Sequence, residues 1–271
     1  MQLTDQLNLG QGFRKYFRID AAIDEALKDD VFRIRHSVYC EDLQFEPESP
    51  DGREIDVYDA HSVHCLLSTS TMPRQPVGCA RLVLANPQDP DAPLPFELTC
   101  ASALDRSIID PAKLPRERIA EISRLAVHRS YRRRKGEDQT TVQVSESDYS
   151  AGEHPRFPFV PTSLLLGAVA LAECSGIETV FVLTEPRLAA HFVKLGVEVR
   201  QIGQSVEHRG RRIPSVMHVE EIIRNMRAIL HPLWHVVRQD IARGLEAARN
   251  SATAPDATSA GWPEAEAKPA S

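Results

Sequence analysis

Along the first half of the chain, the spacing of hydrophobic positions predicts one long helix followed by a β-hairpin. Apolar residues recur at three- and four-residue steps over residues 23–43, which is the period of a helix with one buried face. Two apolar runs, 63–70 and 77–84, are joined by a turn around Pro73 and predict paired strands. We also expect strands at 13–19 and 119–127, and irregular, proline-containing structure at 44–60 and 86–95.

The second half predicts a compact helix–strand–helix unit and a long amphipathic segment. The apolar run 163–174 predicts a helix that ends before Gly176, followed by a buried strand at 179–184. Pro186 suits the first turn of another helix, and Gly196 ends it. Strands are expected at 197–202 and 213–219, and then an amphipathic helix over 220–248 that Pro232 should split. This order of elements lacks a regular βαβ alternation. We therefore expect an α/β protein of the α+β type, with a mixed sheet and helices on both faces.

The composition divides the chain into three parts. Residues 1–219 carry the mixed pattern of one domain, interrupted by a long polar loop at 129–162. Residues 220–249 form a helical appendage, whose apolar stripe could also make a peripheral membrane contact. Residues 250–271 are rich in Ala, Pro and Ser and predict a disordered tail.

Charge and cysteine content exclude several classes of protein. The net charge is −6 over 271 residues, which argues against a nucleic-acid partner. The five cysteines are odd in number and form no Cys-x-x-Cys pair, which argues against a disulfide framework or a closed zinc site. No stretch has the pattern of a signal peptide or a membrane-spanning helix, and we therefore expect a cytoplasmic protein. From the cysteine pattern we also expect no bound metal.

Four short motifs carry the candidate chemistry, and their order is more informative than any one of them. They are Arg-Ile-Arg-His-Ser-Val-Tyr at 33–39, Asp-Val-Tyr-Asp at 56–59, Gly-Cys-Ala-Arg-Leu at 78–82 and Glu-Ile-Ser-Arg-Leu-Ala-Val at 121–127. In order and spacing these motifs resemble the acyl-homoserine-lactone autoinducer synthases. The resemblance implies a GNAT-like acyltransferase fold with a central twisted, mostly antiparallel sheet and helices on both faces.

The same resemblance implies roles for particular residues. Substrate binding would fall to the helix arginine with its two aromatic companions, to the Asp-x-x-Asp pair and to the strand-end arginine, namely Arg35, Tyr39, Phe45, Asp56, Asp59 and Arg81. Catalysis would fall to Glu121 and Arg124. The His-Arg-Gly-Arg-Arg-Ile-Pro turn at 208–214 is more similar to acyltransferases associated with PEP-CTERM/exosortase systems, which are related to N-acyl amino acid synthases. That second resemblance implies an amino acid as the acyl acceptor.

Glu121 and Arg124 lie three residues apart in a predicted strand, where their side chains would face opposite sides of the sheet. A β-bulge would bring both charges to one side and free a backbone N–H. That N–H could stabilise the oxyanion formed from a thioester, while Glu121 takes a proton from the attacking amine, directly or through water. The alternative is a structural Glu–Arg ion pair on an interior strand.

The other polar candidates also have two interpretations. Arg35 and Tyr39 share one helix face, where Arg35 would bind a carboxylate or order the acceptor site. Alternatively, Arg35 is a surface residue paired with Asp42 or a neighbouring acid. Asp56 and Asp59 would orient Arg35 or Arg81, or bind the acceptor amine, or they serve only as turn residues.

The basic run Arg132, Arg133, Arg134 and Lys135 follows the predicted catalytic strand directly. It could dock an acidic acyl carrier protein or its phosphopantetheine arm. A solvated charge run and an RNA-binding surface are the alternatives.

Together these features predict an enzyme that moves a fatty acyl group from a thioester, on acyl carrier protein or coenzyme A, to the amine of an amino acid. The thioester is a co-substrate, and no further cofactor is expected. Two alternatives stay open: an acyl-homoserine-lactone synthase that uses S-adenosylmethionine, and a non-catalytic module that binds an acyl ligand or its carrier.

Overall fold

A computed structural model describes residues 9–131 and 160–253 of the chain. Its centre is an eight-stranded sheet with the strand order β1-β2-β3-β4-β5-β8-β6, and β7 pairs with β8. The strands are β1 (Phe17–Ala21), β2 (Ser62–Thr69), β3 (Pro76–Val83), β4 (Ile119–Val127), β5 (Thr179–Thr184), β6 (Arg200–Gln201), β7 (Val206–Glu207) and β8 (Arg211–His218). Among the described strands only the β4–β5 pair is parallel, so the predicted mixed, mostly antiparallel sheet is confirmed.

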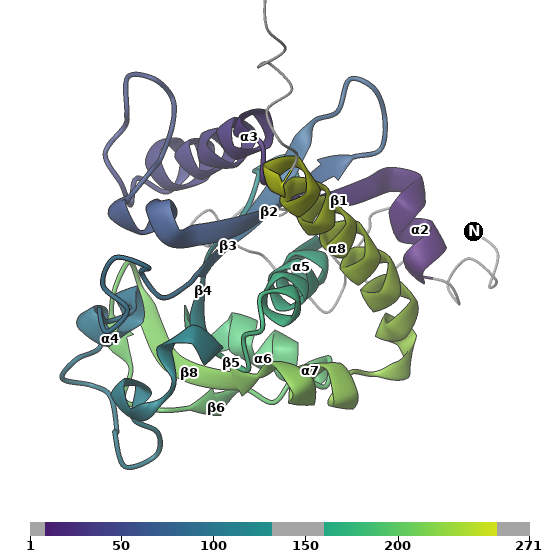
Figure 1. The fold of residues 1–271 in the computed structure, drawn as a ribbon. Coiled ribbons are helices and arrows are strands. Elements are labelled where there is room, and N and C mark those ends of the chain that lie inside the picture. Colours follow the sequence, from purple (N-terminus) through teal and green to yellow (C-terminus); the bar gives the residue numbers. More distant parts are fainter. Residues whose placement is uncertain (1–8, 132–159, 254–271) are drawn as a thin grey trace, which may run out of the picture.

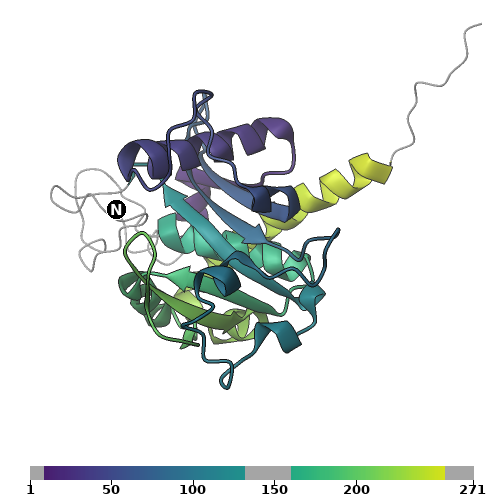
Figure 2. The same cartoon turned by 90° about the vertical axis from the view of Figure 1, so that its left-hand side faces the viewer.

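The helices cover both faces of this sheet (Figure 1, Figure 2). The α-helices are α2 (Leu9–Tyr16), α3 (Glu25–Arg35), α4 (Pro95–Thr99), α5 (Val160–Cys174), α6 (Pro186–Lys194), α7 (Val219–Asn225) and α8 (His231–Thr253). A π-helical segment, η1 (His36–Asp42), continues α3, and short 3₁₀ turns are η2 (Val57–His61), η3 (Pro111–Lys113), η4 (Arg116–Arg118) and η6 (Ala228–Leu230).

Strand β2 shows how the two faces are built. Cys65 and Leu67 belong to the main core with α5, whereas Leu66 between them packs in the core under α3. This alternation follows from the two-residue period of a strand. Both faces of the central strands are therefore covered, and polar groups at the end of the sheet must find partners within the protein.

Helix α5 is buried over almost its whole length, from Val160 to Ala172. It begins three residues earlier than predicted, so residues 160–162 of the predicted polar loop 129–162 are helical. The apolar character of this helix explains its position, because it packs against β2, β3, β4 and α8 at once. Residues 132–159 of the predicted loop lie outside the described residues.

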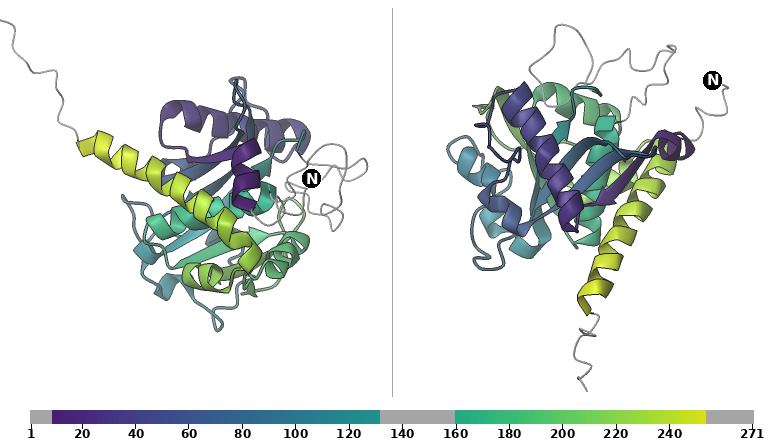
Figure 3. Two further views of the ribbon diagram at one scale, coloured as in Figure 1. Left: turned by 90° about the vertical axis from the view of Figure 1, so that its right-hand side faces the viewer. Right: turned by 90° about the horizontal axis from the view of Figure 1, so that it is seen from above.

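The C-terminal segment divides near Pro232, as predicted, into α7 and α8. The apolar stripe of α8 is buried: Leu233, Val237 and Ile241 have no exposed surface and join the main core. Helix α8 packs against α5, β1 and α2 (Figure 3). Segment 220–249 thus packs against the rest of the domain and is not an appendage. The apolar stripe that suggested a membrane contact is covered by other parts of the protein. No helix among the described residues is long and apolar enough to cross a bilayer.

Two local predictions need correction. Residues 13–19 were expected to form a strand, but residues up to Tyr16 belong to helix α2, and β1 starts only at Phe17. A short apolar run does not distinguish a helix from a strand by its period. The strand expected at 197–202 shortens to the two residues of β6. The tail prediction, 250–271, overlaps the end of α8, which runs to Thr253, and otherwise lies outside the described residues.

Candidate active site

Strand β4 contains a β-bulge, the feature that would bring Glu121 and Arg124 to one side of the sheet. Arg81 of β3 lies opposite Ser123, and Cys79 lies opposite Ala126. Two residues of β4, Arg124 and Leu125, therefore oppose a single residue of β3, which defines a bulge. Arg124 adopts a left-handed backbone conformation with φ of +49°. A left-handed residue interrupts the regular alternation of side chains along a strand.

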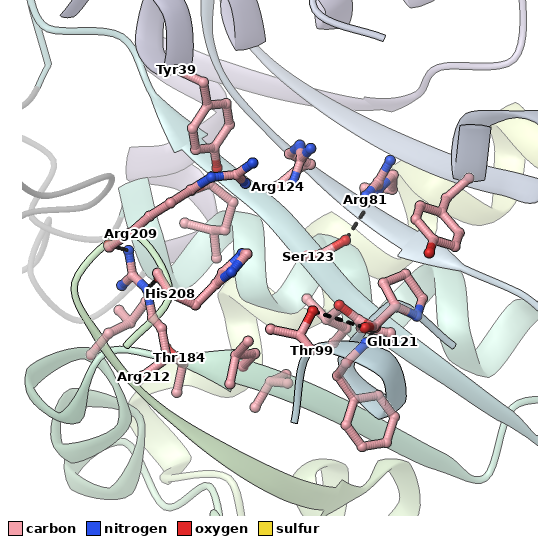
Figure 4. A pocket seen from close by; sticks show the side chains of 18 of the residues that line it. Tyr39, Arg81, Thr99, Glu121, Ser123, Arg124, Thr184, His208, Arg209 and Arg212 are labelled. Carbon is pink, nitrogen blue, oxygen red and sulfur yellow. Dashed lines mark hydrogen bonds between the residues drawn. The ribbon is translucent and has the colours of Figure 1, made fainter. Parts of the chain in front are cut away.

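Strands β4 and β5 part just before the bulge. Their parallel pairing ends at Ile122 and Val182, although β4 continues for five more residues to Val127. A cavity of about 290 Å³ lies at this point, lined by residues of both strands (Figure 4). Leu165 of α5 and Leu188 and Phe192 of α6 contribute apolar side chains to its wall. Helices α5 and α6 thus each contribute to this cavity.

Glu121 lines the cavity and is almost fully buried, with 4% of its surface exposed. Its Oε2 accepts a hydrogen bond of 2.7 Å from the backbone N–H of Phe96, near the start of α4. Burial raises the pKa of Glu121 to about 7, because the charged carboxylate loses its hydration. At neutral pH this carboxyl group exchanges protons readily, which suits a general base.

Arg124 does not pair with Glu121. Its guanidinium bonds instead to Asp56 Oδ2 at 2.9 Å, Glu54 Oε1 at 3.0 Å and Glu46 Oε1 at 3.3 Å. It also lies over the ring of Tyr39, 5.5 Å from the centroid. The alternative of a structural Glu121–Arg124 ion pair is therefore not the arrangement in the molecule.

Three arginines and three carboxylates form a closed ring of ion pairs beside the cavity. Arg35 donates to Asp59 through both Nη atoms, at 2.7 and 3.0 Å, and to Glu54 through Nε at 2.5 Å. Arg81 Nη1 contacts Asp59 at 2.9 Å and Asp56 at 2.6 Å, and Arg124 closes the ring between Asp56 and Glu54. Such a network is compensated in charge, so burying it is tolerated.

The ring settles the position of most predicted substrate-binding residues. Arg35 is fully buried and pairs with Glu54 and Asp59, not with Asp42. Asp56 and Asp59 contact Arg81 and Arg35, and their side chains also cap η2. Arg81 additionally donates from Nε to Ser123 Oγ at 3.1 Å (Figure 4).

The aromatic pair lies on the other side of Arg124. The Tyr39 hydroxyl donates to the backbone oxygen of Leu125 at 3.2 Å, within the bulge. Both Tyr39 and Phe45 line the cavity. The structure thus brings Glu121, Arg124, Tyr39, Phe45, Asp56 and Arg81 to one cavity, with Arg35 and Asp59 behind them.

Several site residues were not identified from the sequence. Glu46 and Glu54 come from the acidic loop after η1, and the cavity wall also includes His208, Arg209 and Arg212 of the β7–β8 hairpin. The basic turn was visible as a motif, but nothing in its spacing indicated that it reaches the β4 bulge. Arg132, Arg133, Arg134 and Lys135 lie outside the described residues, so carrier docking stays a prediction. The described residues include no group of three His, Cys, Asp or Glu side chains that could hold a metal.

Comparison with known proteins agrees with this geometry. Residues 34–141 match the family model of the acetyltransferase (GNAT) domain, a span that includes the bulged strand and all eight residues predicted for catalysis and substrate binding. No curated protein matches the sequence. The resemblance to acyltransferases of PEP-CTERM systems stays a prediction.

Solved structures share the fold at low sequence identity. The acyl-homoserine-lactone synthase BjaI, solved with SAM and isopentyl-CoA, is 18% identical with a TM-score of 0.55, covering 82% of this chain and 90% of its own. The synthase LasI is 19% identical with a TM-score of 0.51, and the match covers 75% of this chain and 89% of LasI. FeeM, an N-acyl amino acid synthase from uncultured soil microbes, is 14% identical with a TM-score of 0.50, and the match covers 79% of this chain and 96% of FeeM. We conclude that residues 34–141 resemble a GNAT acetyltransferase domain and that the chain shares the fold of these synthases.

Proposed function

We propose that the protein transfers a fatty acyl group from a thioester, on acyl carrier protein or coenzyme A, to the amine of an amino acid, giving an N-acyl amino acid. The observation that carries this proposal is the position of Glu121, a buried carboxyl with a pKa near 7 in the wall of a cavity between two parting strands. The apolar wall from α5 and α6 suits the acyl chain, and the charged wall from β4 and its surroundings suits a zwitterionic acceptor.

In the proposed reaction Glu121 accepts a proton from the acceptor's ammonium group, directly or through a water molecule. The freed amine attacks the thioester carbonyl, and a C–N bond forms as the carbonyl becomes an oxyanion. A backbone N–H at the β4 bulge would stabilise this oxyanion. Collapse breaks the C–S bond, so that one amine proton ends on the thiol and one is released to solvent. The products are the amide, the free thiol and one proton.

The ion-pair ring holds the charged side of the cavity in one arrangement. Arg124 contacts three carboxylates and Tyr39, and Arg81 contacts two carboxylates and Ser123. Side chains fixed by several partners need no reorganisation when the substrate arrives, which favours catalysis by preorganisation. Arg35 and Asp59 act through these neighbours and are positioning residues.

Mass spectrometry of lipids from cells that express the protein tests the proposal, with Glu121→Gln as the matched control. The proposal predicts N-acyl amino acids that depend on Glu121. Acyl-homoserine lactones in their place would identify the alternative, a synthase that uses S-adenosylmethionine. The absence of any new acylated amine in a folded, expressed protein would favour a non-catalytic binding module.

A further inference from the structure

Glu46 occupies an unusual position at the charged side of the cavity. Its Oε1 contacts both Arg124 Nη2, at 3.3 Å, and Arg209 Nη2, so one carboxylate joins two arginines that line the cavity. Arg124 comes from the β4 bulge, and Arg209 comes from the β7–β8 hairpin on the opposite wall. In Figure 4 the Arg209 side chain extends from the hairpin toward Tyr39 and Arg124.

The backbone around this contact is strained at three places. Among the described residues, the non-glycine residues with positive φ are Gln44 at +53°, Arg124 at +49° and Arg209 at +54°. Two of them are the arginines that meet at Glu46, and the third lies two residues before it. Left-handed conformations are costly for residues with a β-carbon, and they gather at functional sites. Arg209 stands at a hairpin tip where glycine or asparagine would be less costly.

The bond between Glu46 and Arg124 is the longest of the three that Arg124 Nη2 makes, at 3.3 Å against 3.0 Å to Glu54 and 2.9 Å to Asp56. Arg124 therefore keeps two partners if Glu46 leaves. Glu46 is also the ion-pair partner of Arg209, whose side chain is 28% exposed. Glu46 could turn to solvent without leaving a buried charge alone.

The surroundings favour an anion of single charge. His208 also lines the cavity, and burial together with the charges of Arg209, Arg212 and Arg124 holds its pKa below the usual value. A neutral imidazole can donate to an incoming anion without adding a charge. Exchange of one carboxylate for another keeps the charge balance of Arg124 and Arg209 unchanged, whereas a doubly charged phosphate would not.

We propose that Glu46 occupies the binding position of the acceptor's α-carboxylate. When the amino acid binds, its carboxylate displaces Glu46 from Arg124 and Arg209. This inference rests on the proposed function and makes Arg209 and Glu46 determinants of acceptor choice. Arg209 would recognise the carboxylate, while Glu46 competes with that carboxylate for both arginines. The acceptor's ammonium then faces the same cavity as Glu121.

The test compares two acceptors with one acyl donor held at saturation: the amino acid with the highest turnover, and its carboxamide. The measured quantity is the ratio of kcat/KM for the acid to kcat/KM for the amide. Arg209→Gln should lower this ratio by about tenfold or more, the loss of one charge-assisted hydrogen bond, and Glu46→Gln should raise it by about threefold or more. Arg211→Gln is the matched control, since Arg211 is exposed on the same hairpin and does not line the cavity.

The alternatives give different results. An unchanged ratio in both variants, or a higher KM for the acyl donor in Arg209→Gln with the acceptor unaffected, would overturn the inference and leave N-acyltransfer standing. Transfer to no amino acid at all by the wild type would overturn the proposed function itself. If Arg209→Gln fails to fold, Arg209→Lys retains the charge without the planar fork and should lower the ratio in the same direction.

Discussion

Removing Arg35 from the ion-pair ring should destabilise the protein far more than removing an exposed arginine from the same helix. Arg35 is fully buried and contacts Glu54 and Asp59, whose side chains are 7% and 5% exposed. Arg35→Met keeps most of the volume but leaves these carboxylates short of one positive charge. Breaking a buried ion pair in this way costs about 3–5 kcal/mol of the free energy of unfolding. Arg33→Met breaks an exposed, solvent-screened pair with Asp29 and should change the stability much less than Arg35→Met does.

The pH dependence adds a second check on this reasoning. Burial alone would raise the pKa of Asp59, but the hydrogen bonds and charge of Arg35, with the charge of Arg81, outweigh it and hold the pKa below its usual range. A lowered folded-state pKa contributes stability above the unfolded pKa, near 4, and loses it as the pH falls through the folded pKa. In Arg35→Met burial dominates again, so the buried carboxylates take up protons more readily than in the wild type. The difference in stability between the two proteins should therefore shrink as the pH falls from 7 to 4.

Urea unfolding followed by circular dichroism, at pH 7 and pH 4, measures both effects. A loss below about 1 kcal/mol for Arg35→Met at pH 7, or one no larger than that for Arg33→Met, would refute the assignment of Arg35 to a closed, desolvated ring. A difference that grows toward pH 4 would contradict the proposed origin of the pKa shift.

Three further predictions concern turnover. Glu121→Gln should lower kcat by about 10²-fold or more with the fold intact, and near-normal turnover in the folded variant would remove Glu121 from the mechanism. In the wild type, kcat/KM for the donor should rise with pH through about 7 and then level off, because the base must be unprotonated. Leu165→Phe fills part of the apolar wall and should shift donor preference toward shorter acyl chains, measured with a chain-length series; an unchanged preference would place the acyl chain elsewhere. Arg132→Glu with Arg133→Glu should raise KM for acyl carrier protein much more than for acyl-coenzyme A, and an equal loss with both donors would place these arginines at the phosphate itself.

Local patterns predicted most of the sheet. Strands β4 and β5 have the predicted ends, and the hairpin of β2 and β3 differs by one residue at each end. The spacing of Glu121 and Arg124, three apart in an interior strand, raised a bulge as one possibility and a structural ion pair as the other, and the spacing alone could not decide between them. Helix α2 could not be anticipated, since Phe13 and Phe17 suit a short strand as well as a helix that ends between them.

The glutamate partner in the ion-pair ring, Glu54, was not predictable from spacing. Arg35 and Glu54 are 19 residues apart, and Arg124 and Glu54 are 70 apart. Such pairs form only when the loop after η1 folds back against the β4 bulge. The sequence has many acids in that loop, and nothing local distinguishes Glu46 and Glu54 from their neighbours. The four motifs identified the arginines and aspartates of the site through a family resemblance, and the tertiary fold identified the glutamates.

The most direct measurement of the central claim uses the purified protein with an acyl donor and a mixture of ¹⁵N-labelled amino acids. Mass spectrometry then determines whether the label enters an acylated product. The account predicts ¹⁵N-labelled N-acyl amino acid from the wild type and about 10²-fold less from folded Glu121→Gln. An acyl-homoserine lactone formed only when S-adenosylmethionine is added, or equal product from both proteins, would contradict it.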